Sequence, residues 1–229
     1  MIRMSPRTVW LFDLDNTLHD AGAFVFPELR QSMRSYVQEA LQVDADEAIR
    51  LNHHYWHRYG ATLLGLMRHH GVKPAHFLHD THRLPGLEQQ VSGHRHDVEA
   101  LARLPGRKYI LTNAPRAYAL RVLGLLGILR LFDGVIAIED MTMFGHLRPK
   151  PDARMLQRMA VKLGVPAQRC VLVEDTLVHQ KAARSVGMGT VWMQRFARRG
   201  DHGGPTVARW SMRPAYVDRT VTALRQLMR

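Results

Sequence analysis

The chain has 229 residues, of which 46% are hydrophobic and 23% are charged. These proportions are ordinary for a globular protein with one core, or with a core and a smaller insert. No stretch approaches the ~20 consecutive apolar residues that a membrane span requires, and the first residues lack the cleavage site of a signal peptide. The single cysteine, Cys170, excludes an internal disulfide. These features predict a cytoplasmic protein with no membrane partner.

The chain is basic, because 32 lysines and arginines oppose 20 aspartates and glutamates, for a formal net charge of +12. Such a balance raises nucleic acid as a partner. The arginines are nevertheless spread along the whole chain, and the densest group, Arg195, Arg198 and Arg199, is accompanied by no aromatic stacking platform. The pattern disfavours nucleic acid and favours a surface field that attracts small anionic substrates.

Fourteen histidines raise the question of a histidine metal site. His76, His79 and His82 recur at intervals of three, and His53-His54 and His69-His70 are adjacent pairs. Intervals of three and six drift around a helix, and no cysteine or carboxylate cluster completes a ligand set. We therefore interpret these histidines as part of a polar helix surface.

The first 100 residues predict one strand and then only helices. Residues 8–12 form a short apolar run typical of a buried strand. Helical spacing and capping residues then predict helices from Pro27, from Asp44 with Glu47 as a capping box, over 61–71, over 74–82, and through 98–104. Because no strand pattern occurs between residues 20 and 95, these helices form an insert.

From residue 108 onward, strands and helices alternate. The predicted strands are 108–111, 134–138, 171–173 and 190–193, and the predicted helices are 115–126, 152–163 and 176–186. Residues 197–213 predict an exposed loop, Tyr216-Val217 a last short strand, and residues 218–228 a final helix. Alternation of this kind predicts an α/β protein with a parallel sheet covered by helices on both faces.

Polar side chains follow three of the predicted strands. They are Asp13 and Asp15, Thr112, and Glu174 with Asp175. Loops at the carboxyl ends of parallel strands converge on one crevice, and Lys150, in a nearby predicted loop, can supply a cation there. Clustered carboxylates repel one another unless a hard divalent cation such as Mg²⁺ lies between them.

This set of residues is suited to the hydrolysis of a phosphate ester. Asp13 attacks phosphorus as a nucleophile, and Asp15 protonates the leaving oxygen and later deprotonates water. Thr112 and Lys150 hold the transferring oxygens, while Asp175, with Glu174 beside it, completes the metal shell. Taken singly, each group has an ordinary alternative, such as a solvated turn or a helix cap. Their order along the chain, each at a strand end or an adjoining loop, favours the catalytic interpretation.

The chain resembles the haloacid dehalogenase superfamily at four motifs, Phe12–Leu18, Leu111–Asn113, Lys150-Pro151 and Val173–Thr176. The resemblance implies a Rossmann-like core, residues 1–19 and 96–229, and a helical cap, residues 20–95, inserted between the first and second core strands. It also implies Mg²⁺ bound by the Asp13 side chain, the Asp15 backbone carbonyl and Asp175. Haloalkanoate dehalogenases of this superfamily lack the second aspartate, so Asp15 favours phosphate chemistry.

Within that superfamily, the chain is similar to the pyrimidine 5′-nucleotidase branch. The similar segments are Tyr59–Thr62 with Gly65-Leu66, Leu84–Leu87, Leu111–Ala114 and Glu174–Leu177. This similarity implies a nucleoside monophosphate as the small phosphorylated substrate. Asn113 in the core and Arg58, Tyr59 and Gly60 in the cap are the predicted substrate contacts. His179 is a departure, because many members carry Asp or Asn four residues after the metal aspartate.

Two alternatives remain at this stage. The substrate could be another small ester, such as a sugar phosphate or phosphoglycolate, because the cap decides the substrate and its sequence is the least informative part. Alternatively, the chain could be a basic binding protein that keeps the fold without catalysis. The intact set of Asp13, Asp15, Lys150 and Asp175 argues against the binding protein.

Overall fold

The computed structural model describes residues 5–196 and 212–228. The chain divides into two compact units, one formed by Met1–Gly22 with Glu88–Arg229 and the other by Ala23–Leu87. We call these the core unit and the helical unit, and each is described by itself.

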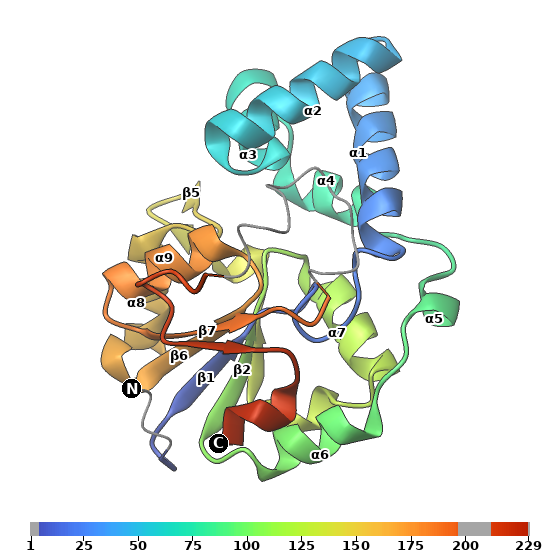
Figure 1. The fold of residues 1–229 in the computed structure, drawn as a ribbon. Helices are drawn as coiled ribbons and strands as arrows, with labels where there is room; N and C mark the ends of the chain where they lie inside the picture. Colours follow the sequence, from blue (N-terminus) through green and yellow to red (C-terminus); the bar gives the residue numbers. More distant parts are fainter. Residues whose placement is uncertain (1–4, 197–211, 229) are drawn as a thin grey trace. The chain divides into compact units, whose positions relative to one another are not determined.

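The core unit contains a parallel sheet of six strands in the order β3-β2-β1-β6-β7-β8 (Figure 1). The strands are β1 (Val9–Phe12), β2 (Arg107–Leu111), β3 (Gly134–Ile136), β6 (Cys170–Glu174), β7 (Gly189–Met193) and β8 (Arg219–Val221). All four residues of β1 are buried, as expected for the central strand of a sheet covered on both faces. The predicted α/β class and parallel sheet are confirmed.

Helices cover the sheet on both sides, with α8 and α9 on one face and α6 and α7 on the other (Figure 1). Their bounds are Arg95–Arg103 for α6, Arg116–Leu125 for α7, Ala153–Lys162 for α8 and Leu177–Ser185 for α9, with a short α5 at Leu87–Gln90. The sequence alternates because each parallel strand requires such a crossover. Met155 and Met159, one turn apart on α8, pack with Val9, Leu11 and Leu172 of the sheet in one buried cluster.

The register of the sheet brings the predicted site residues to one edge. Phe12, the last residue of β1, pairs with Ile110 of β2 and Val173 of β6. The ladder continues past the strand end, because the Asp13 N–H donates to the Val173 carbonyl at 2.9 Å. The carboxyl ends of β1, β2 and β6 therefore lie side by side, and the loops that follow them start from neighbouring positions.

A small hairpin between β3 and Lys150 was not predicted. Its antiparallel strands are β4 (Thr142–Met143) and β5 (His146–Leu147), and the two turn residues, Phe144 and Gly145, both have positive φ. That conformation is typical of a two-residue hairpin turn, but phenylalanine is unusual there. Two-residue strands are too short for alternation of apolar and polar residues to predict them.

The prediction for the end of the chain is wrong in detail. Tyr216-Val217 is a turn rather than a strand, and the last strand is β8, three residues later. The residues after it form a 3₁₀ helix, Leu224–Met228, instead of an α-helix over 218–228. Asp218 sets this register, because its carboxylate accepts hydrogen bonds from the Thr190 N–H and the Arg184 guanidinium. The predicted exposed loop falls largely on 197–211, outside the described residues.

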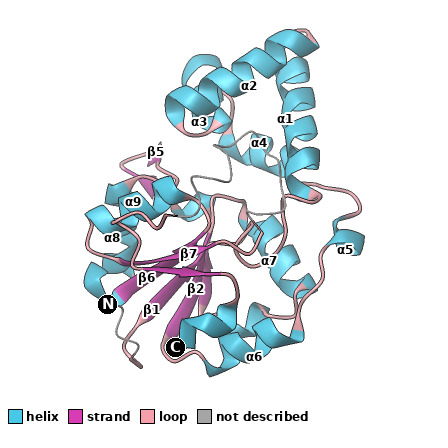
Figure 2. Cartoon of the chain, in the orientation of Figure 1, coloured by secondary structure: helices cyan, strands magenta, loops and turns pink. Residues whose placement is uncertain are grey.

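The helical unit consists of α1 (Val25–Leu41), α2 (Ala45–Tyr59), α3 (Thr62–His70) and α4 (Pro74–Thr81), and residues 23–87, all described, contain no strand (Figure 2). Asp44 caps α2 as predicted, because its Oδ1 accepts the Glu47 N–H at 2.8 Å. Pro27 is the third residue of α1 rather than the first, and proline is tolerated there because first-turn N–H groups have no partner within the helix.

Across both units, the described residues include no helix that is long and apolar enough to cross a membrane.

Candidate active site

The loop after β1 holds the Asp13 carboxylate in a fixed position. Asn16 adopts a left-handed conformation, with φ of 57°, which asparagine tolerates better than most residues. Its side chain accepts the Gly22 N–H at 3.0 Å and closes the loop. The Thr17 hydroxyl then donates to Asp13 Oδ2 at 3.1 Å. Asn16 and Thr17 therefore have structural roles that explain why the loop has this sequence.

Lys150 joins two of the predicted carboxylates. Its ammonium nitrogen lies 2.6 Å from Asp13 Oδ1 and 2.7 Å from Glu174 Oε2, and the whole residue is only 2% exposed. Asp13 and Lys150 are 137 positions apart in the sequence, so only the sheet topology brings them together. A buried ion pair needs such multiple contacts, because each charge has lost its hydration.

Asn113, predicted to contact substrate, holds the backbone of Lys150 within the core unit, and its contact with substrate stays a prediction. Its Oδ1 accepts the Lys150 N–H at 2.9 Å, and its Nδ2 donates to the Lys150 carbonyl at 3.0 Å. Both polar atoms of the amide are thus engaged by one residue. This arrangement fixes the start of the Lys150 side chain, so that its ammonium group reaches Asp13.

Thr112 follows β2 and is 1% exposed. Its N–H extends the ladder to the Ile136 carbonyl at 3.0 Å. Its hydroxyl oxygen accepts the Ala114 N–H, also at 3.0 Å. Since the oxygen is the acceptor in that bond, the hydroxyl hydrogen can still be donated elsewhere.

Asp175 lies just beyond β6, and its backbone is tied to the sheet. The Trp192 indole N–H donates to the Asp175 carbonyl at 2.8 Å, and the buried Gln180 amide donates to the Glu174 carbonyl at 2.9 Å. One side-chain oxygen from each of Asp13, Glu174 and Asp175 lies within 4.8 Å of the other two. Hard oxygen ligands at this spacing fit Mg²⁺.

The electrostatics of this cluster indicate a shortage of positive charge. Burial and the charge of Glu174 raise the pKa of Asp13 to about 6, although Lys150 acts in the opposite direction. Burial, followed by the charge of Glu174, also raises the pKa of Asp175 well above its usual range. One ammonium group does not balance three carboxylates, and a divalent cation among them would favour their ionised forms.

Glu174 and Lys150 are instead stabilised in their charged forms. Burial alone would raise the pKa of Glu174, but Lys150 and then His179 lower it well below its usual value. Burial likewise opposes the charge on Lys150, yet Asp13 and Glu174 raise its pKa. His179, at the position of the departure from the superfamily pattern, has Nδ1 3.0 Å from Glu174 Oε2. It therefore faces Glu174 with a potential donor where many members carry another acidic or amide side chain.

Asp15 has two neighbours that the sequence analysis missed. The Tyr118 hydroxyl donates to Asp15 Oδ1 at 2.6 Å, and His19 Nε2 lies 2.8 Å from the same oxygen. His19 is four residues after Asp15 in the same loop, and Tyr118 is in the first turn of α7, just after Thr112 and Asn113. Their closeness to the motifs was visible in the sequence, but no spacing rule links them to Asp15.

The other predicted substrate contacts lie at the end of α2 in the helical unit. Gly60 is the left-handed C-cap of that helix, with φ of 80°, and this conformation alone explains a glycine there. The Tyr59 hydroxyl is 2.6 Å from His69 Nε2. Arg58 is exposed, and its guanidinium carbon lies 5.9 Å from the centre of the Tyr59 ring.

Comparison with known proteins identifies the family. The profile of haloacid dehalogenase-like hydrolases matches residues 8–187, a range that begins just before β1 and includes all four motifs. The chain belongs to the haloacid dehalogenase-like hydrolase family.

Two curated relatives of this hydrolase carry names connected with phosphate. Phosphate metabolism protein 8 of Saccharomyces cerevisiae is 28% identical over 198 residues, covering 81% of this chain and 61% of that protein. The plasmid-encoded phosphoglycolate phosphatase of Cupriavidus necator is 27% identical over 179 residues, covering 78% of this chain and 64% of that protein. The matched region thus spans less than two thirds of either relative.

The fold is also found in solved structures. CbbY from Rhodobacter sphaeroides, crystallised in complex with phosphate, has a TM-score of 0.62 and 19% identity, and the match covers 96% of each chain. At this level of identity, the similarity concerns the fold alone.

Proposed function

We propose that this hydrolase is a Mg²⁺-dependent phosphomonoesterase that forms a phospho-aspartate on Asp13. The observation that supports it best is the contact of the buried Lys150 ammonium with both Asp13 and Glu174, at 2.6 and 2.7 Å. A lysine held in this way keeps its positive charge beside a carboxylate that is poised to meet an anionic substrate. Phosphate in the names of the two relatives supports the same substrate class.

The reaction has two displacement steps at phosphorus. An oxygen of Asp13 attacks the phosphorus atom, and the ester oxygen leaves with the bonding electrons and takes a proton from Asp15. Asp15, now ionised, removes a proton from water, and the water oxygen attacks the phosphorus of phospho-Asp13. Inorganic phosphate leaves, and Asp13 is regenerated. The Lys150 ammonium and the Thr112 hydroxyl donate hydrogen bonds to the transferring oxygens.

The metal site is part of the proposal. Asp13, Asp175 and the Asp15 backbone carbonyl, with Glu174 beside them, would hold a magnesium ion. When bound there, magnesium supplies positive charge that offsets the phosphate dianion and the crowded carboxylates. Asn113 contributes by fixing the Lys150 backbone, and Thr17 by holding the second oxygen of Asp13.

For the substrate, we propose a nucleoside 5′-monophosphate with a pyrimidine base. The support is the similarity of Tyr59-Gly60 and the neighbouring segments to the pyrimidine 5′-nucleotidase branch. Tyr59 has an aromatic ring of the kind that stacks on bases, and Arg58 has a guanidinium of the kind that binds anions. Asn113, whose amide bonds the Lys150 backbone, remains a proposed substrate contact in the core unit.

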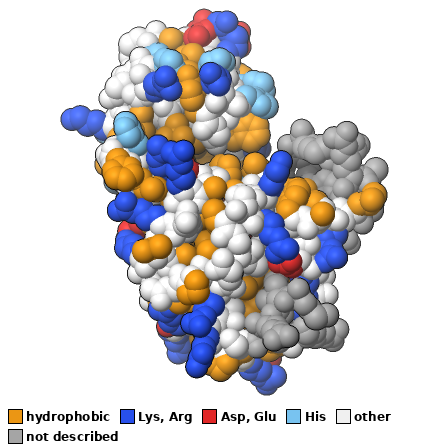
Figure 3. Space-filling view, turned by 90° about the vertical axis from the view of Figure 1, so that its left-hand side faces the viewer, with side chains coloured by type: hydrophobic (Ala, Val, Ile, Leu, Met, Phe, Trp, Pro, Cys, Tyr) orange, Lys and Arg blue, Asp and Glu red, His pale blue; other side chains and the backbone are white. Residues whose placement is uncertain are grey.

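A second candidate is a small non-nucleotide ester such as phosphoglycolate or a sugar phosphate. It is favoured by the name of the Cupriavidus relative, a phosphoglycolate phosphatase. A non-catalytic role in nucleic-acid binding has less support. On the face drawn in Figure 3, lysine and arginine side chains are scattered and do not form one continuous patch.

One experiment tests the class and the substrate together. Purified protein is assayed for phosphate release from UMP, CMP, AMP, GMP, phosphoglycolate and several sugar phosphates, with and without Mg²⁺. We expect Mg²⁺-dependent release, with the highest kcat/KM for UMP or CMP. A preference of more than ~10-fold for a sugar phosphate or phosphoglycolate, about 1.4 kcal/mol, rejects the nucleotidase assignment alone. No release from any ester rejects the phosphatase.

A further inference from the structure

The Asp15 carboxylate is held by two buried side chains from separate parts of the core unit. Tyr118 and His19 are each 3% exposed, so neither can turn toward solvent. Both meet the same oxygen, Oδ1, and their own polar atoms are 3.5 Å apart. Asp15 itself has a side chain that is 19% exposed. Two anchored groups thus direct a carboxylate that is partly open to solvent.

The chemistry of these contacts is consistent with two donors. The Tyr118 hydroxyl donates to Asp15 Oδ1, because an ionised carboxylate oxygen can only accept a hydrogen bond. His19 Nδ1 is buried without a hydrogen-bond partner among the described residues. Because a buried N–H without an acceptor is costly, the neutral ring is best protonated on Nε2, which then also donates to Asp15.

We propose that Tyr118 and His19 are positioning residues, which hold the Asp15 carboxylate in the orientation that delivers its proton to the leaving oxygen. This inference rests on the proposed phosphatase function. The role of Asp15 is required most when the leaving group is an alkoxide, because a poor leaving group must be protonated as its bond to phosphorus breaks. Because Asp15 Oδ1 is held in place before the reaction, the carboxylate does not have to rotate into the productive rotamer.

The test compares leaving groups in the variant Tyr118→Phe, which removes one hydroxyl and little volume. We expect kcat for an alkyl phosphate such as glycerol phosphate to fall by about 10-fold or more. The rate with p-nitrophenyl phosphate, whose leaving group needs little protonation, should fall less than ~3-fold. Across a series of substituted phenyl phosphates, the rate should depend more steeply on the leaving-group pKa than in wild type.

Two variants of His19 and one control variant keep the test decisive. His19→Ala should show the same split between substrates, and His19→Gln, whose amide nitrogen can reach the place of Nε2, should recover part of the lost rate. Tyr36→Phe is the matched control, because it removes a hydroxyl that bonds His76 Nδ1 at 2.9 Å in the helical unit, and it should leave the leaving-group dependence unchanged.

The outcomes separate this inference from the proposed function. Equal losses on alkyl and aryl substrates in both Tyr118→Phe and His19→Ala, or no loss in either, overturn the positioning role while the phosphatase stands. If the wild type releases phosphate from neither substrate, both proposals fall. If Tyr118→Phe does not fold, the His19 pair decides.

An independent observation concerns the opposite edge of the sheet. A cavity of about 380 Å³ lies at the amino-terminal ends of the strands, and its lining includes Thr8 before β1, Arg169 before β6 and Gly189 at the start of β7. The proposed active-site residues follow the strands, so one strand length of four or five residues, roughly 15 Å, separates the two places. The cavity belongs to no part of the site described above.

Three arginines, Arg7, Arg169 and Arg184, are among the residues that line this cavity, together with one acidic residue, Asp218. Arg184 is paired with Asp218 at 3.0 Å. Within residues 5–196 and 212–228, Arg7 and Arg169 have no ion pair. A concave surface lined by two arginines without an ion pair among the described residues favours an oxyanion.

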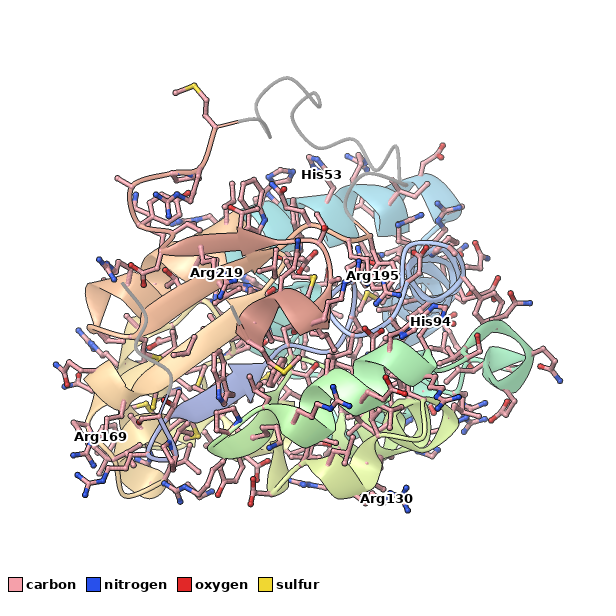
Figure 4. The ribbon with its side chains drawn as sticks, turned by 60° about the horizontal axis from the view of Figure 1, so that its bottom comes forward. His53, His94, Arg130, Arg169, Arg195 and Arg219 are labelled. Atoms are coloured by element: carbon pink, nitrogen blue, oxygen red, sulfur yellow. The ribbon has the colours of Figure 1, made fainter. Side chains whose placement is uncertain are left out.

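We infer that this cavity binds a small phosphate-bearing anion, separately from the active site. The probe is inorganic pyrophosphate in isothermal titration calorimetry. Arg169→Ala and Arg7→Ala should each weaken one binding event by about 5-fold or more, while Arg130→Ala, an exposed arginine elsewhere on the core unit (Figure 4), should not. If pyrophosphate binding is lost in Lys150→Ala and is unaffected in both Arg169→Ala and Arg7→Ala, all pyrophosphate binds at the active site. That result overturns the inference.

Discussion

The two units of this hydrolase hold their polar residues in different ways. In the core unit, Lys150 reaches Asp13 across 137 positions of sequence and Tyr118 reaches Asp15 across 103. In the helical unit, the polar contacts of the predicted substrate residues are local, such as Tyr59 with His69, ten positions apart. The core contacts are buried and multiple, whereas Arg58 and Gly60 are exposed.

Because of this difference, some residues can be explained by local structure alone and others cannot. A buried ammonium between two carboxylates is not explained by apolar packing, and removing one partner leaves an uncompensated charge. A chemical purpose is then the simplest explanation. Gly60, in contrast, is explained by the left-handed end of α2, and Gly65 by close packing on Tyr55. The similarity of these positions to a nucleotidase branch therefore carries less information about substrate than the core motifs carry about chemistry.

The contrast between the two units would be contradicted most clearly if turnover did not need the Asp13 carboxylate. Asp13→Asn keeps the size of the side chain and removes the nucleophile, so we expect turnover to fall by about 10⁴-fold or more. Thermal unfolding followed by circular dichroism should show that the protein is still folded. Single-turnover experiments with ³²P-labelled substrate should trap a phosphoprotein in wild type and none in the variant. Labelling of the variant to the wild-type level contradicts the assignment.

The next largest effect concerns metal. Protein treated with a chelator should lose phosphatase activity and recover it with Mg²⁺. Mg²⁺ should also raise the melting temperature of wild type, because a ligand that binds only the folded state stabilises it. In Asp175→Asn, this shift should shrink, since one charged ligand is missing. Asp152→Asn, which removes a carboxylate outside the cluster, is the control and should keep the shift. An equal shift in Asp175→Asn places the ion elsewhere.

Much of the core could be predicted from the sequence. The strands of a parallel sheet are recognisable as local patterns, although they come together from distant parts of the chain. A buried strand followed by Asp13, and another followed by Glu174 and Asp175, are visible as apolar runs that end in acidic residues. Parallel topology then places those ends together without knowledge of any contact. The roles of the individual site residues remain proposals, because a pattern at a strand end places a side chain without showing which bond it makes or breaks.

Other features could not be predicted, for identifiable reasons. The contacts of Tyr118 and Asn113 depend on side-chain direction at an α-helix start and in a loop, which periodicity does not describe. The strand β8 was misplaced because its position depends on Asp218 bonding to Thr190 and Arg184, residues of other elements. Nothing in the sequence indicates that His19 and Tyr118 share one oxygen of Asp15.

Two glycines, one in each unit, differ in the space around them. A Cβ at Gly65 in α3 would lie 2.1 Å from Tyr55 Cγ, whereas one at Gly124 in α7 would meet nothing within 4 Å. Alanine favours a helix over glycine by ~1 kcal/mol, so Gly124→Ala should stabilise the protein by about 0.5–1 kcal/mol. Gly65→Ala should destabilise it by about 1–3 kcal/mol despite the same gain. Urea unfolding measures both, and a stabilising Gly65→Ala contradicts the packing of Tyr55.

The smallest effect tests the cap of α8, the helix that packs Met155 and Met159 against the sheet. Asp152 Oδ1 accepts the Met155 N–H at 3.0 Å, and Oδ2 accepts from the Arg148 guanidinium at 2.9 Å. Partial burial opposes ionisation, but the Met155 N–H and Arg148 outweigh it and lower the pKa of Asp152. Asparagine is nearly as good a cap as aspartate, so Asp152→Asn isolates the effect of the charge, and Asp152→Ala removes the cap as well.

The pH dependence of these variants follows from the sign of that shift. A carboxyl group with a lowered folded-state pKa contributes stability above its unfolded pKa of ~3.9, and loses it as the pH falls through the folded value. At pH 7, Asp152→Asn should therefore cost a few tenths of a kcal/mol and Asp152→Ala about 1 kcal/mol. In urea unfolding, the difference between wild type and Asp152→Asn should shrink as the pH falls below the unfolded pKa of ~3.9 and through the lower folded-state pKa, because protonated aspartate then resembles asparagine. A difference between wild type and Asp152→Asn that stays constant from pH 7 to pH 3 contradicts the charged cap. The charged cap is supported if that difference is lost while Asp152→Ala remains less stable than wild type, since the neutral cap still accepts the Met155 N–H.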